Sequence, residues 1–258
     1  MTGDRHEYDE ILTWIASSLW LGPTPAEDGI RRCEAMRAEL RESPEAEAAI
    51  LRHMAGLHAM VGQFDLARRL LATGQALCAE LGLTLNAATA QNEAFVELLA
   101  GNPAAAEVSL RAGYRALEEM GERAFRSTTA ALIARALLEQ RRDAEAEEFA
   151  ALSARLTARG DRLTQILWRG VRARVLARRA EMDEALVLAR EEVAIATATD
   201  FVNYRADAFL DLSQVLTSGG RRDEAVAAAA DALDLYERKG NLVASASARQ
   251  QLGELEKI

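Results

Sequence analysis

A short turn motif recurs along the chain at almost constant spacing, and this periodicity limits the possible folds more than any other feature. Each of five copies ends in an alanine, and successive alanines are 39, 40, 39 and 40 residues apart. A weaker copy, TPAEDG, ends at Gly29, 38 residues before the first alanine. A repeat of this length is typical of stacked helix pairs. The five copies are GQFDLA, GNPAAA, RRDAEA, AEMDEA and GRRDEA, which end at Ala67, Ala106, Ala146, Ala185 and Ala225.

The residues around each motif predict the same local structure. We expect a helix A before the turn, a helix B after it, and then a loop in which glycine adopts a left-handed conformation. A further amphipathic stretch at residues 242–255 is suited to cover the open end of the stack. The expected fold is all-α: a right-handed α-solenoid of about six helix pairs with a C-terminal capping helix, forming one domain over residues 1–258. The loop positions are Gly82, Gly121, Gly160, Asp200 and Gly240.

The composition agrees with packed helices and excludes several classes of function. Half of the residues are hydrophobic and only four are proline. The formal net charge of −9 argues against binding of a nucleic-acid backbone, which requires a broad basic face. The two cysteines lack the spacing of a metal or redox site, and no segment is long and apolar enough to cross a bilayer. We therefore expect a cytoplasmic protein without direct contact to nucleic acid or membrane.

Sequence motifs of catalysis are missing. The chain has no GxxxxGK(S/T) phosphate loop, no GxGxxG after a strand and no GxSxG nucleophile motif. His53 and His58 are five residues apart, which places them on different faces of a helix, and no HExxH pattern surrounds them. We expect no enzymatic activity, no cofactor and no metal site.

These repeats resemble the tetratricopeptide repeats (TPR). In that family a small residue closes helix A, an aromatic or apolar residue follows the turn, and an alanine comes three residues later. Gly62, Phe64 and Ala67 match this pattern, whereas Pro103 and Asp143 depart from it at the aromatic position. The period also exceeds the usual 34 residues of the family. The resemblance implies a superhelix with a concave binding face.

A second resemblance extends over nearly the whole chain. The segments GPTPAEDGIRRCEAM, AFVELLAGNPAAAE, LWRGVRARVLARR and LYERKGN are similar to the C-terminal repeat region of large actinobacterial regulators. Those regulators join a cyclase domain or a DNA-binding domain to a signalling ATPase and then to helical repeats. The resemblance implies a sensor or scaffold role, with a cyclase, ATPase or DNA-binding output domain as one kind of partner. It transfers no catalytic residue to this chain.

One basic segment contrasts with the acidic remainder of the chain. Residues 155–179 contain eight arginines and a single acid, Asp161, so that their local charge is +7 (8 − 1). Three interpretations of this segment remain open. The arginines could form a solvated surface, an ion-pair network between repeats, or a patch that binds a carboxylate or phosphate of a partner.

The register of the turns suggests partners for two of these arginines. Arg169 and Arg172 are expected to face the core, with Asp207 and Asp211 on the next helix A as their counterions. Trp168 is one turn before Arg172, so the two side chains share a helix face and could stack. A tryptophan beside arginines is typical both of a binding hot spot and of packing between repeats.

The inner wall of the superhelix is expected to come from the A helices. A mixture of polar and apolar groups there favours binding of a peptide or partner domain in a concave groove. The alternative is a sensor that binds a small anionic effector. The groove positions expected from the register are Arg52, Gln91, Phe95, Arg135, Arg174, Asp207, Leu210 and Gln214, and the basic segment adds Trp168, Arg169 and Arg172 to the candidate binding residues.

Overall fold

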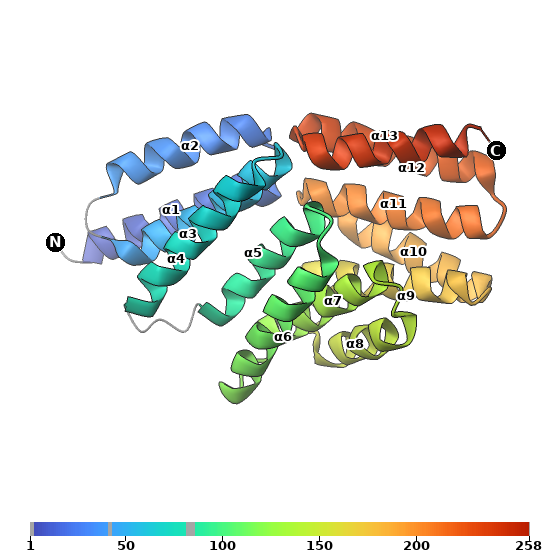
Figure 1. The fold of residues 1–258 in the computed structure, drawn as a ribbon, viewed down its shortest axis with the longest axis horizontal. Helices are drawn as coiled ribbons and strands as arrows, with labels where there is room; N and C mark the ends of the chain where they lie inside the picture. The colour runs from blue at the N-terminus through green and yellow to red at the C-terminus, as the bar shows by residue number, and fades with distance from the viewer. Residues whose placement is uncertain (1–2, 41–42, 81–85, 258) are drawn as a thin grey trace.

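The chain forms consecutive pairs of antiparallel helices. The computed structural model describes residues 3–40, 43–80 and 86–257, and these residues contain thirteen α-helices (Figure 1). The predicted all-α fold of helix pairs is confirmed. The A helices are α1 (Gly3–Leu21), α3 (Pro44–Met60), α5 (Asn86–Leu99), α7 (Ala124–Glu139), α9 (Arg162–Arg178) and α11 (Val202–Ser218). The B helices are α2 (Ala26–Glu39), α4 (Phe64–Glu80), α6 (Pro103–Glu119), α8 (Asp143–Leu156), α10 (Met182–Thr197) and α12 (Arg222–Lys239), and α13 (Leu242–Leu255) follows the last pair as expected.

The turn between helix A and helix B has one conformation in five of the pairs. The first residue of each turn motif has a left-handed backbone conformation, with φ between 63° and 81°. The amide of the following residue donates to the carbonyl oxygen five positions earlier, at 2.8–3.0 Å. This is the Schellman arrangement that satisfies the last carbonyl groups of a helix. The left-handed residues are Gly62, Gly101, Arg141, Ala180 and Gly220, so the backbone keeps the period even where glycine is absent.

The alanine that ends each motif is the fourth residue of helix B and is completely buried. All five alanines have an exposed fraction of 0%. Gly29 takes the same position in α2, where an added Cβ would lie 3.0 Å from a methyl carbon of Leu57 in α3. Small residues are required here because the two helices of a pair approach closely.

The loops between repeats follow the prediction only in part. Gly121 and Gly240 are left-handed, with φ of 69° and 68°. The same expectation is wrong for Gly160 and Asp200, neither of which has a positive φ. The chain leaves α8 through an extended residue (φ −65°, ψ 133°), so that turn does not require glycine. Gly82 lies outside the described residues.

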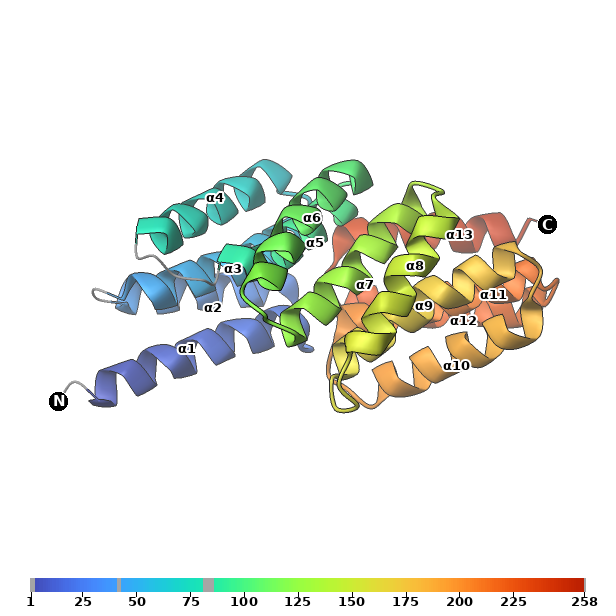
Figure 2. The same cartoon turned by 90° about the horizontal axis from the view of Figure 1, so that it is seen from below.

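The array of helix pairs is curved so that its last repeat contacts its first two. The A helices pack side by side, α7 against α9 and α9 against α11, while α13 also packs against α3 (Figures 1 and 2). Asn203 at the start of α11 and Met60 at the end of α3 are in contact, with the amide nitrogen 3.6 Å from the sulfur. The C-terminal repeats therefore lie directly against the N-terminal ones.

Lys239 makes the most specific contact between the two ends. Its side chain is 0% exposed, and its ammonium nitrogen donates to the carbonyl oxygens of Leu19, Gly22 and Thr24 at 2.8, 2.8 and 2.7 Å. These carbonyl groups lie at the end of α1, where a helix has unsatisfied acceptors and favours positive charge. Burial lowers the pKa of Lys239 to about 8, which leaves most of the ammonium charged at pH 7.

Across residues 3–40, 43–80 and 86–257, we find no helix with the length and hydrophobicity that a membrane span needs. Cys33 and Cys78 are both buried and free, in agreement with their expected place in the core.

Lys239→Met should lower the free energy of unfolding by roughly 3 kcal/mol, because it removes the donor of three carbonyl groups, two of them in buried contacts. Lys257→Met changes the other lysine of the chain, which is exposed, and is the matched control. Urea denaturation of both variants measures the difference. Equal stability of the two variants would contradict the role of Lys239 in holding the ends together.

Arg141→Gly and Ala180→Gly should each raise the free energy of unfolding by about 0.5–1 kcal/mol, because glycine adopts a positive φ without strain. Gly101→Ala is the reverse change at an equivalent turn. It should lower the stability by a similar amount, although nothing lies within 4 Å of the added Cβ. Thermal and urea denaturation would test all three, and a loss of stability in both glycine variants would refute the argument.

Candidate functional site

The concave side of the array encloses a cavity of about 450 Å³. Its wall comes mainly from α5, α7, α9, α11 and α13, with single residues from α6, α10 and α12. The expectation that A helices build the inner wall therefore agrees with the structure. Of the predicted groove residues, the cavity is lined by Phe95, Arg135, Arg174, Asp207, Leu210 and Gln214.

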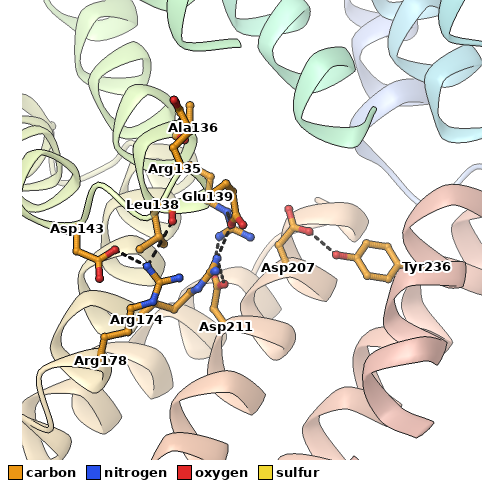
Figure 3. A network of polar contacts seen from close by, with 11 residues as sticks. Arg135, Ala136, Leu138, Glu139, Asp143, Arg174, Arg178, Asp207, Asp211 and Tyr236 are labelled. Atoms are coloured by element: carbon orange, nitrogen blue, oxygen red, sulfur yellow. Dashed lines mark hydrogen bonds and ion pairs between the residues drawn. The ribbon is translucent and has the colours of Figure 1, made fainter. Parts of the chain in front are cut away.

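A buried carboxylate ties three successive A helices together at this cavity (Figure 3). Asp211 of α11 is 0% exposed and accepts from Arg135 of α7 at 2.5 Å and from Arg174 of α9 at 3.3 Å. Arg174 also donates to Glu139 of α7 at 2.7 Å. Because each charge has an opposite charge beside it, the group can be buried without an uncompensated ion.

The pKa values of the network follow from this pairing. Burial alone would lower the pKa of Arg135, but the negative charges of Asp211 and Glu139 outweigh it and raise that pKa. Burial would raise the pKa of Glu139, yet Arg174 and Arg135 hold it below the usual value. Arg135 and Glu139 are therefore charged at neutral pH.

Glu192 of α10 lies in the cavity wall and forms no ion pair with any residue that the structure describes. Its exposed fraction is 1%, and burial, together with the negative charge of Asp211, raises its pKa well above the ordinary value. Room for this carboxyl group comes from Gly170 of α9, where an added Cβ would lie 2.5 Å from both Glu192 Oε1 and Asp211 Oδ2. Glycine at this position is thus required by the two carboxyl groups.

Asp207 of α11 is a further acid of the cavity wall. The hydroxyl group of Tyr236 in α12 donates to its Oδ1 atom (Figure 3). Burial raises the pKa of Asp207, and the charge of Arg135 and the hydrogen bond from Tyr236 oppose that rise. Burial likewise raises the pKa of Tyr236 well above its ordinary value.

The expected partners of Arg169 and Arg172 are wrong. Arg169 pairs with Glu191 at 2.9 Å and Arg172 with Glu184 at 3.0 Å, both on α10, and neither arginine lines the cavity. Residues three and four apart share a helix face, so Gly170 and Arg174 point toward α11 while Arg169 and Arg172 point toward α10.

The arginines of the basic segment do form ion pairs, but with acids other than the expected ones. Arg178 pairs with Asp143 and Arg179 with Glu147, both on α8 of the preceding repeat. Trp168 stacks on Arg169, 4.2 Å from its guanidinium carbon to the ring centroid, rather than on Arg172. Trp168 also packs against apolar residues of two neighbouring clusters, which agrees with a role in packing between repeats.

Two predicted groove residues lie away from the cavity. Gln91 of α5 donates to the carbonyl oxygen of Phe125 and to the hydroxyl group of Thr129, both at 3.0 Å, and so connects α5 to α7. Arg52 of α3 does not line the cavity, and burial lowers the pKa of its guanidinium group.

Sequence reasoning missed four important wall residues: Glu139, Glu192, Tyr204 and Tyr236. One signal for them was present, because glycine inside a helix costs stability and marks a close approach of another group. Gly170 is such a glycine. No group of three or more His, Cys, Asp or Glu side chains in the described ranges is arranged to hold a metal ion.

Neither a protein-family model nor a curated protein matches this sequence. Solved structures do match. The nearly identical TPR-like repeats of a candidate kinesin light chain from Podosopora anserina align with a TM-score of 0.51 at 20% identity, covering 76% of this chain and 97% of that one. BtubC (BKLC) from P. vanneervenii aligns with a TM-score of 0.55 at 16% identity, covering 81% and 87%.

The fold defines a TPR-like repeat protein. At 16–20% identity the similarity shows the fold alone. TPR-like repeats are generally protein–protein interaction modules and are typically non-catalytic.

Arg174→Gln should lower the free energy of unfolding by about 3 kcal/mol, because it removes one of two cations beside the buried Asp211. Arg172→Gln on the same helix is the matched control. The side chains of Arg172 and Glu184 are 35% and 53% exposed, so losing that pair should cost under about 1 kcal/mol. Similar losses in the two variants, measured by urea denaturation, would show that Asp211 does not depend on Arg174.

Proposed function

We propose that this chain is a protein–protein interaction module that holds a segment of a partner polypeptide at its concave wall. The observation that carries the proposal is the cavity of about 450 Å³ built from four successive helix pairs, α5 to α12, and the capping helix α13. TPR-like folds generally act by binding proteins, and a concave face lined by A helices is the surface that such a superhelix offers to a ligand.

The chemistry of the wall supports a peptide as ligand. Phe95, Leu98 and Leu210 provide apolar surface, while Gln214 and Gln251 provide amide groups that can bond to a peptide backbone. Apolar contacts would supply most of the affinity, and the few polar groups would fix the orientation of the segment.

A small anionic effector has weaker support. The two arginines of the wall, Arg135 and Arg174, are already paired with Asp211 and Glu139. An incoming carboxylate or phosphate would meet these acids as well as the arginines, and like charges in a poorly hydrated site repel.

The partner that we favour is an output domain of a signalling assembly in the cytoplasm. The similarity of segments such as residues 94–107 and 167–179 to the repeat regions of actinobacterial regulators supports this proposal. In such an assembly the repeats would bind a cyclase, an ATPase or a DNA-binding domain rather than perform chemistry themselves.

Gln214→Trp should weaken peptide binding because the indole takes up part of the cavity. Selection of random linear peptides on the wild-type protein, followed by affinity measurement, provides the assay. Binding of selected peptides should weaken at least roughly tenfold in Gln214→Trp. Val187→Trp is the matched control, since Val187 is 55% exposed on α10 and does not line the cavity, and it should bind as the wild type does.

Failure of the wild-type protein to select any peptide would overturn the proposal. Equal affinity of the wild type and Gln214→Trp would also overturn it, because binding would then occur elsewhere on the surface. Circular dichroism of both variants is the control for folding.

A further inference from the structure

Acidic groups outnumber basic groups on the cavity wall. Glu139, Glu192 and Asp207 line it together with only two cations, Arg135 and Arg174. The carboxyl group of Asp211, in contact with both arginines, raises the number of acids around the cavity to four. Two of the four acids therefore have no cation of their own, and a carboxyl group in a low-dielectric environment is stabilised in its charged form by a ligand that brings a cation.

The two cations are already neutralised by two of the acids. Arg135 contacts Asp211 at 2.5 Å and Glu139 at 3.5 Å, and Arg174 contacts Glu139 at 2.7 Å and Asp211 at 3.3 Å. In the part of the chain that the structure describes, no lysine or arginine lies within ion-pair distance of Glu192 or Asp207. These two carboxyl groups are the unmatched ones.

Glu192 has a free acceptor in addition to a missing counterion. Its Oε2 atom is buried and has no hydrogen-bond partner among the described residues. An unsatisfied carboxyl oxygen in a buried position is costly, and its persistence is typical of a site that a ligand completes. Glu192 is one of the residues that line the cavity, so its carboxyl group lies beside the space that a ligand would occupy.

Aromatic rings stand around the same cavity. Phe95, Tyr204 and Tyr236 line it from α5, α11 and α12. The faces of such rings attract a cation, and the combination of carboxyl groups with rings is a common way to bind ammonium and guanidinium groups.

We propose that the cavity binds a cationic group, an ammonium or a guanidinium, between Glu192 and Asp207, and that the group is a lysine or arginine side chain of the partner segment. This inference rests on the proposed function for the source of the cation. The same chemistry is available in a free amine, which the experiment distinguishes.

Binding of a cation has a consequence for protons. Burial and the charge of Asp211 raise the pKa of Glu192 and so favour its protonated form, whereas a ligand cation favours the charged form, so binding should release protons to the solvent. Binding should therefore tighten as the pH rises. The charges that act on Glu192 are those of Asp211 and Asp207 on α11, Arg135 on α7 and Arg174 on α9. The other titratable groups of the wall are Glu139 on α7, Tyr204 on α11 and Tyr236 on α12.

The test compares peptides that differ only in charge. Short alanine-rich peptides with a central lysine, arginine, norleucine or glutamate, and spermidine as a free amine, are titrated into the full chain by calorimetry in two buffers of different ionisation enthalpy. The lysine and arginine peptides should bind at least roughly tenfold more tightly than the norleucine peptide, with proton release. Glu192→Gln should remove both the preference and the proton release.

Glu191→Gln is the matched control, because Glu191 is the adjacent residue on α10 and pairs with Arg169 outside the cavity. It should leave binding unchanged. Glu192→Gln should also raise the melting temperature at pH 8 more than at pH 5, since ionisation of a group with a raised pKa opposes folding above its ordinary value of 4.5. A more stable protein that no longer binds cations excludes loss of folding as the cause.

Each outcome decides one of the two proposals. If peptides bind without regard to charge, or if Glu192→Gln binds as well as the wild type, the cationic site is overturned and the interaction module stands. If spermidine binds through Glu192 and no peptide does, the cationic site stands and the peptide as its source is overturned. If neither binds, both proposals fail.

Discussion

The carboxyl group of Asp211 has no contact with water, and the packing of three repeats follows from the way its charge is balanced. Arg135 comes from α7, Arg174 from α9 and Asp211 itself from α11, so the ion pairs fix the rotation of each A helix relative to the next. A hydrophobic contact tolerates a shift of register more easily than a charged one, because a displaced ion would remain buried without its partner. The wall of the cavity thus has a defined geometry.

Local features of the fold could be predicted from the sequence, and contacts between repeats could not. The turns and the buried alanines depend on residues close together in the chain, and their period was visible at once. The pairing of Asp211 depends on how far each helix rotates against the next. Arg174 and Arg172 are only two residues apart but lie on different faces of α9. Arg174 pairs with Asp211, whereas Arg172 pairs with Glu184. The hydrogen bonds of Lys239 to residues 19–24 depend on the sum of the rotations between successive repeats along the whole array.

The residues of the cavity illustrate a conflict between folding and binding. Glu192 is a buried acid with a raised pKa and an unpaired oxygen, and Gly170 is a poor helix former that leaves space for it. Neither choice improves the stability of the isolated chain. Proteins that break local rules in one place usually do so where a ligand is recognised, and these two residues break them at the same point of the wall.

Contact between the first and last repeats changes how such a molecule can come apart. In an open solenoid each repeat touches only its neighbours, so the ends fray first and unfolding proceeds along the array. Here the contacts of Lys239 join positions 215 to 220 residues apart, and both terminal repeats are held by them. Loosening either end exposes the same buried ammonium group. The array therefore has no weakest end, and its unfolding is more cooperative than that of a linear stack of equal length.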